Sequence, residues 1–171
     1  MNIDLVQMLA NLSLSLNPIQ HFISGGAYVL GIVFLVSAIT KIKKLSGSGH
    51  ESSYGALIFF MVGVALLFLP TALSLMANTA FGTDNVLTYA PLDKNNVYSV
   101  VGLLVRTAGL LWFVRGCILL THTSQPGAKL GSKAMAFIVA GLFAMNLNST
   151  IAMLNTIMQA LIKMTMYVKP S

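Results

Sequence analysis

The stretch that decides the fold is residues 97–120, VYSVVGLLVRTAGLLWFVRGCILL, in which only Arg106 and Arg115 are charged. A helix needs about 20 mostly apolar residues to cross a hydrocarbon layer roughly 30 Å thick. Three further stretches, residues 19–40, 54–76 and 134–155, have the same character. Barrel strands would alternate apolar and polar residues, and these runs do not. The sequence therefore predicts an all-α integral membrane protein with four transmembrane helices.

The overall composition excludes an ordinary soluble enzyme. Of 171 residues, 56% are hydrophobic and 8% are charged, and the mean hydropathy is +0.82. Typical soluble domains carry about 25% charged residues, which is what covers a water-facing surface. The net charge of +6 comes from basic residues that are scattered or lie beside apolar runs. That placement sets membrane topology, so we expect no direct nucleic-acid binding.

The charges of the connections predict the orientation in the membrane. Lys41, Lys43 and Lys44 follow the first stretch, and Lys129 and Lys133 precede the fourth. The connection between the second and third stretches has two acids and one lysine. By the positive-inside rule both basic connections are cytoplasmic, which places both termini on the far side of the membrane.

Residues 1–17 show the pattern of an amphipathic helix lying in the membrane interface, although a frayed terminus is the alternative. Leucines recur at helical spacing on one face and polar residues on another. The residues concerned are Leu5, Leu9, Leu12 and Leu16 against Asp4, Gln7, Asn11 and Ser15. Asn17 and Pro18 then predict a helix boundary, and residues 18–171 form the four-helix transmembrane domain.

The fourth stretch continues as an amphipathic extension to about residue 168, which is longer than a bilayer requires, so it must tilt, bend or protrude. Asn148, Asn155 and Gln159 are spaced to share one face of this helix. A polar face in such a helix normally meets a protein partner or water.

A weak internal duplication appears when the chain is shifted along itself so that Gly31 meets Gly109. Without a gap, this repeat shift also aligns Val36 with Val114, Ser46 with Ser124, Gly49 with Gly127, Ala56 with Ala134, Phe59 with Phe137, Gly63 with Gly141 and Leu69 with Leu147. The apolar stretches and the basic connections coincide at the same shift. An even number of spans separates the two copies, so the alignment predicts two parallel repeated hairpins.

Two arginines lie in the third stretch, nine residues apart. Arg106 and Arg115 are separated by roughly 13.5 Å along a helix, so both can extend to opposite headgroup layers. The functional alternative is that Arg106 contacts a lipid phosphate, a partner's carboxylate or an aqueous lumen, with Arg115 as a second contact of this kind.

The glycines of the third stretch predict close helix packing. Gly102, Gly109 and Gly116 repeat every seven residues, and small residues on one face let a second helix approach closely. We expect the same of Gly141, the glycine in the middle of the fourth stretch.

Enzymatic motifs are nearly absent from the chain. The three histidines lie in different segments, no spacing suits a metal ion, and no acid lies inside an apolar stretch. We therefore predict no catalytic residue, no metal site and no cofactor, with a bound phospholipid as the one small-molecule ligand that the arginines would suit.

The sequence resembles a family of small bacterial membrane proteins. The features are Met8-Leu9-Ala10-Asn11-Leu12-Ser13 before Tyr28-Val29-Leu30-Gly31, the lysine-rich first connection, Gly102-x-x-x-Arg106 through Arg115-Gly116, and the Gly141 to Asn146 segment. They are similar to the IcmC/DotE and DotV membrane proteins of Dot/Icm type IVB secretion systems and of related IncI-type conjugation systems. The resemblance implies a multi-pass inner-membrane subunit, without enzymatic activity, of a machine that exports protein or DNA.

The resemblance also implies the partners, namely membrane lipids and other secretion-system subunits in a homo- or hetero-oligomer. Two alternatives use the same residues. A freestanding small channel or holin-like oligomer would also be basic, helical and non-enzymatic. A pilin-like filament subunit would leave the membrane with lipid bound to its arginines.

Overall fold

The computed structural model describes residues 5–48, 53–82, 97–123 and 129–168, and all regular structure in these ranges is helical. The all-α prediction is confirmed for this part of the chain. The helices are α1 (Leu5–Ser48), α2 (Ser53–Leu67), α3 (Leu69–Phe81), α4 (Val97–His122), α5 (Gly131–Met145) and α6 (Leu147–Val168).

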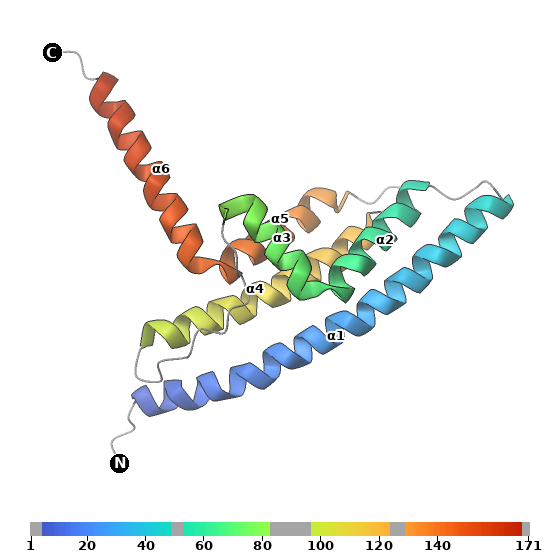
Figure 1. The fold of residues 1–171 in the computed structure, drawn as a ribbon, viewed down its shortest axis with the longest axis horizontal. Helices are drawn as coiled ribbons and strands as arrows, with labels where there is room; N and C mark the ends of the chain where they lie inside the picture. The colour runs from blue at the N-terminus through green and yellow to red at the C-terminus, as the bar shows by residue number, and fades with distance from the viewer. Residues whose placement is uncertain (1–4, 49–52, 83–96, 124–128, 169–171) are drawn as a thin grey trace.

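The two longest apolar helices, α1 and α4, run alongside each other (Figure 1). Leu14–Gly47 of α1 and Val100–His122 of α4 are long and apolar enough to cross a membrane. The predicted first and third spans therefore coincide with continuous helices, which are compatible with a membrane protein.

The second and fourth predicted spans are not continuous helices, so the predicted count of four spans is not confirmed. The chain bends by 100° between α2 and α3, at Phe68, and by 98° between α5 and α6, at Asn146. Each pair reaches the length and apolarity of a span only when its two helices are taken together, so the structure has two to four candidate spans.

Different residues lie at the two bends. Pro70, two residues after Phe68, lacks a backbone N–H and cannot continue the hydrogen bonding of α2, but it suits the first turn of the new helix α3. Asn146 has no proline nearby. Its Nδ2 instead donates to the Leu142 carbonyl at 3.0 Å, the local side-chain bonding by which asparagine competes with the helix.

The repeat shift seen in the sequence also relates the bounds of α2 to those of α5. Helices α2 and α5 each contain 15 residues, and the shift carries the first residue of α2, Ser53, onto the first residue of α5, Gly131. It also carries Phe68 onto Asn146, and these two residues have nearly the same backbone angles, φ −104° and ψ 42° against φ −106° and ψ 47°. The two bends are thus alike in backbone geometry although their side chains differ.

Glycine brings the backbones of α1 and α2 together. A Cβ atom at Gly31 would lie 2.7 Å from the Leu67 nitrogen and 2.9 Å from the Gly63 oxygen. A Cβ at Gly63 would in turn lie 3.0 Å from the Leu35 nitrogen. No other residue type fits at such separations without displacing backbone.

The same contacts recur between α4 and α5, as predicted for Gly109 and Gly141. A Cβ at Gly109 would lie 2.8 Å from the Gly141 oxygen and 2.9 Å from the Met145 nitrogen. Gly116 is equally close to α5, at 2.8 Å from the Ile138 nitrogen. Gly102 differs, because no atom of the described chain lies within 4 Å of its Cβ position, so its predicted packing has no partner among the described residues.

The predicted helix boundary at Asn17 and Pro18 is absent, because α1 continues through Pro18. Proline is tolerated inside membrane helices, where neighbouring groups satisfy the carbonyl that it leaves without a donor. Of the side chains that suggested an amphipathic segment, Leu16 is buried whereas Asn11 and Ser15 are exposed. Asp4 lies outside the described residues, and assignment of this segment to the interface stays a prediction.

The core lies where α1, α2, α4 and α5 meet, with α3 folded onto it. The largest fully buried side chains are Phe113, Leu66, Leu73, Met145 and Val100. Helix α6 instead leaves the bundle (Figure 1), and its side chains are exposed over residues 154–166. The fourth stretch therefore bends and protrudes, two of the three outcomes that its length predicted.

Candidate functional site

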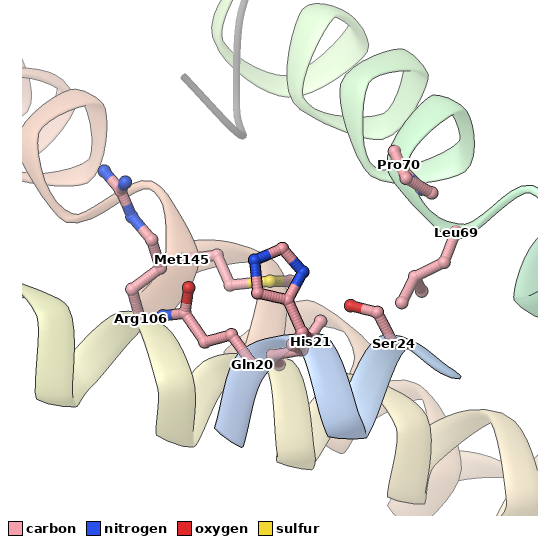
Figure 2. Close-up of a pocket in the computed structure, with 8 residues that line it drawn as sticks. Gln20, His21, Ser24, Leu69, Pro70, Arg106 and Met145 are labelled. Atoms are coloured by element: carbon pink, nitrogen blue, oxygen red, sulfur yellow. The ribbon is translucent and has the colours of Figure 1, made fainter. Parts of the chain in front are cut away.

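A pocket of about 350 Å³ lies where both bends meet the two long helices. Its wall is formed by Gln20, His21 and Ser24 of α1, Leu69 and Pro70 at the start of α3, Arg106 and Leu110 of α4, and Met145 at the end of α5. Figure 2 shows Gln20, His21 and Ser24 on one helix, with Arg106 rising from its neighbour. The pocket thus gathers polar side chains of two apolar helices at one place.

A buried hydrogen bond joins the two long helices beside this pocket. Gln20 donates through Nε2 to the Thr107 hydroxyl at 2.7 Å, and that hydroxyl donates to the Leu103 carbonyl at 2.8 Å. Gln20 and Thr107 are both buried. Because an unsatisfied buried polar group costs about 1–3 kcal/mol, this pair stabilises the packing of α1 on α4.

Arg106 is half-buried in α4 and lines the pocket with His21, which is exposed. The guanidinium has five N–H donors and a permanent charge, and the imidazole and the Ser24 hydroxyl can each donate as well. These groups suit the binding of an anionic or strongly polar group. The described residues hold no group of three potential ligands among His, Cys, Asp and Glu for a metal ion.

The two arginines of α4 lie in different surroundings, because Arg106 lines the pocket and Arg115 does not. Arg115 is exposed, and its guanidinium carbon lies 5.2 Å from the centre of the Phe137 ring on α5. The Lys41 ammonium lies 5.2 Å from the Phe59 ring on α2 in the same way. Phe59 and Phe137 are related by the repeat shift, so each half carries a cation on the equivalent ring.

The basic residues predicted to set topology gather at one end of the bundle. Lys41, Lys43 and Lys44 lie in the last turns of α1, while Lys133 lies in the first turn of α5 and Lys129 just before it. The end of α1 and the start of α5 are on the same side of the fold (Figure 1). The helix arrangement is thus compatible with both basic connections facing one compartment.

The predicted polar face lies on α6 and forms no part of the pocket. Asn148, Asn155 and Gln159 are all exposed along this helix. Exposed apolar side chains of α6 include Ile151, Leu154, Met158 and Leu161. Helix α6 therefore offers both polar and apolar surface away from the core.

The interpretation of the sequence missed Gln20 and Thr107. Each is a single polar residue inside an apolar stretch, and the bonding between them joins positions 87 residues apart. The available signal was their occurrence at bilayer depth, where a polar side chain requires a partner.

Comparison of the chain with protein-family models, with curated proteins and with solved structures finds no match. Function must therefore be inferred from the residues and their arrangement.

Proposed function

We propose that the protein is a non-enzymatic subunit of a membrane machine of the type IVB secretion or IncI-type conjugation class, which exports protein or DNA. Its contribution is to the assembly or the conduit of that machine. The proposal combines the resemblance described above with a chain whose distinctive features are packing surfaces and an exposed helix. Two of the resembling features, the Gly102 to Gly116 segment and the Gly141 to Asn146 segment, form close helix contacts and the second bend.

The observation that carries the proposal is the exposure of α6. A helix of 22 residues leaves the bundle and has both polar and apolar side chains exposed. A helix in the membrane interface would place its apolar side chains in lipid and the amides of Asn155 and Gln159 in water, whereas the hydrocarbon interior alone or water alone suits only one kind. A protein neighbour also provides for both kinds of side chain, as a subunit of a larger assembly requires.

We also infer that the chain consists of two repeated helical hairpins, α1 to α3 and α4 to α6, each with a bent second arm. The support is that one repeat shift relates the bounds of α2 to those of α5, and also relates the bends and the glycine contacts of the two halves. In this proposal each bent pair is one membrane-crossing unit, which gives four spans.

The proposed location is the bacterial inner membrane, with both termini periplasmic. It rests on the lysines that flank the two basic connections. Single cysteines at Ser48, Asn85 and Ser171, in a Cys117→Ala background, test it with an impermeant maleimide that reaches the periplasm. We expect labelling of intact cells at Asn85 and Ser171 only, and labelling of Ser48 alone would reverse the orientation.

Affinity purification of the chain from native membranes tests the function. We expect it to be recovered with a large complex that contains other export subunits. A homo-oligomer that conducts ions when reconstituted alone would instead identify a freestanding channel or holin-like protein. Recovery from extracellular filaments with bound phospholipid would identify a pilin-like subunit.

A further inference from the structure

We propose that a second copy of this chain packs head to tail on the α4–α5–α6 face, with its α1 against α4 and α5 and its α2 and α3 against α6. The proposal rests on the two repeated hairpins proposed above. It goes further by naming the surfaces that two copies use.

The contacts inside each hairpin correspond, but those between the hairpins are one-directional. Helix α4 contacts both α1 and α2, and α3 contacts α5 and α6. The α1–α4 and α3–α6 contacts fit either a two-fold or a head-to-tail relation, so the other two contacts decide between them. A two-fold relation would require matching contacts of α5 with α1 and of α6 with α2. Neither is present among the described residues. The first hairpin therefore meets the second through two different surfaces, which is the geometry of a heterologous interface.

A heterologous interface leaves one unused surface at each end. The first unused surface is on α1, at positions equivalent to the buried face of α4. Val100 is 1% exposed but Phe22, its equivalent under the repeat shift, is 82% exposed, and Cys117 at 3% corresponds to Ile39 at 63%. Two further pairs, buried Thr107 with exposed Val29 and buried Leu110 with exposed Ile32, follow the same pattern.

The second unused surface is on α5 and α6. Leu73 of α3 is fully buried, whereas its equivalent on α6, Ile151, is 48% exposed. On α5, Ala136 is exposed where the equivalent Ile58 of α2 is buried. Small side chains on α5 leave room for the larger apolar side chains that α1 exposes.

A second copy fits these two surfaces without turning over in the membrane. The two hairpins are parallel in the proposed repeat, so extending the same relation adds a copy of the same orientation. The contacts of α1 and α2 with α4 then become contacts of α4 and α5 with the second copy's α1. The contacts of α3 with α5 and α6 become contacts of α6 with the second copy's α2 and α3.

Disulfide cross-linking between differently tagged copies tests this arrangement. Leu66 of α2 and Cys117 of α4 belong to one buried cluster, and their equivalents across the new interface are Ala144 and Ile39. In a Cys117→Ala background, one tagged copy carries Ile39→Cys and the other carries Ala144→Cys. Ala140→Cys, one turn earlier on α5, is the second variant, because Ala144 itself lies close to Gly109.

We expect a disulfide-linked heterodimer when the two variants are mixed in one membrane, and none when either is expressed alone. Val33→Cys replaces Ile39→Cys as the control, because Val33 and its equivalent Leu111 are both exposed. It should give no heterodimer. A dimer from Ile39→Cys alone would show a two-fold interface. The absence of any product from either α5 variant would show that this face of α5 contacts lipid. Both results would overturn the proposal.

The experiment uses cells that lack all other export subunits, so its result does not depend on the proposed function. Cross-linking there, together with a failure to copurify any export complex, would retain the head-to-tail contact and remove the secretion role. Copurification with an export complex, without cross-linking, would retain the secretion role and remove the head-to-tail contact.

Discussion

Helices α3 and α6 follow equivalent bends, yet only α3 lies on the core. Leu73 and Ala77 of α3 are fully buried, while the equivalent positions Ile151 and Asn155 on α6 are exposed. Helix α6 is also longer, with 22 residues against 13. The same bend geometry is thus followed by a covered helix in one half and by an exposed helix in the other. We attribute the difference to the neighbouring helices, which cover this face of α3 but not the equivalent face of α6.

Some features recur in both halves of the molecule, and one joins the two halves to each other. Glycine contacts and bend angles are shared, whereas the buried bond between Gln20 and Thr107 joins the halves once. We expect changes in shared features to act alike in both halves, and changes in features that join the halves to act on their mutual arrangement.

The largest expected effect is that of Gly109→Leu. Its side chain would begin 2.8 Å from the Gly141 oxygen and force α4 away from α5, at a cost of about 1–3 kcal/mol or more. Gly31→Leu should be equally damaging in the first half. The amount of folded protein recovered from membranes, and its thermal stability in detergent, measure both variants.

Gly102→Leu is the matched control on the same helix, because its Cβ position is open. It should fold like the unaltered protein. Tolerance of Gly109→Leu, or equal damage by Gly102→Leu, would contradict the role of Gly109 in the close contact between α4 and α5.

A smaller effect is expected when the two halves are uncoupled. Thr107→Val leaves the buried Gln20 amide without its acceptor and should destabilise the protein by about 1–3 kcal/mol. Gln20→Leu should also destabilise, and the double variant should recover part of the loss. Additive losses in this double-mutant cycle would mean that the pair does not couple α1 to α4.

Much of the fold could be predicted from the sequence because apolar length is a strong signal of membrane helices. The bends could not be predicted equally well. Pro70 was a visible signal for the first, but the apolar run across residues 54–76 concealed it. Asn146 gave a weaker signal, since one asparagine in an apolar segment more often bonds locally without ending a helix.

The candidate site was predicted only in part. Arg106 stands out as a charge in an apolar stretch, but its neighbours Gln20 and His21 come from a helix whose placement is tertiary information. Gly102, by contrast, was predicted to pack against a helix and does not do so among the described residues. A regular spacing of glycines predicts a common face, yet Gly109 and Gly116 lie against α5 whereas no described atom lies within 4 Å of the Gly102 Cβ position.

Arg106 tests whether the pocket contributes to function through its charge. In an export assay, Arg106→Lys should retain part of the activity if simple charge suffices, and little if two parallel hydrogen bonds to a phosphate or carboxylate are required. Arg106→Leu should lose most activity at unchanged protein level. Asn155→Leu probes the polar face of α6 in the same assay. Unaltered export in all three variants would mean that the arginine only extends to the headgroups.

The smallest expected effect concerns the two cations on equivalent rings. Phe137→Leu removes the contact with Arg115, and Phe59→Leu removes that with Lys41. Such contacts contribute about 0.5–1 kcal/mol at exposed sites, so each variant should be slightly less stable. Phe59→Leu should lose more, because its ring also makes an edge-to-face contact with Phe34, with 5.8 Å between the ring centres. Thermal unfolding in detergent measures both, and a larger loss at Phe137 than at Phe59 would contradict this order.

The central claim is that the face of α6 equivalent to the buried face of α3 is covered by another protein chain. A photoreactive amino acid at Ile151 tests it in living cells that carry the complete export machinery. Leu75, exposed on α3, receives the same amino acid as the control. Irradiation should join Ile151 to another chain, seen as a product of higher mass, while Leu75 should yield none. Absence of any such product at Ile151, in protein that is inserted at its normal level, would contradict the claim.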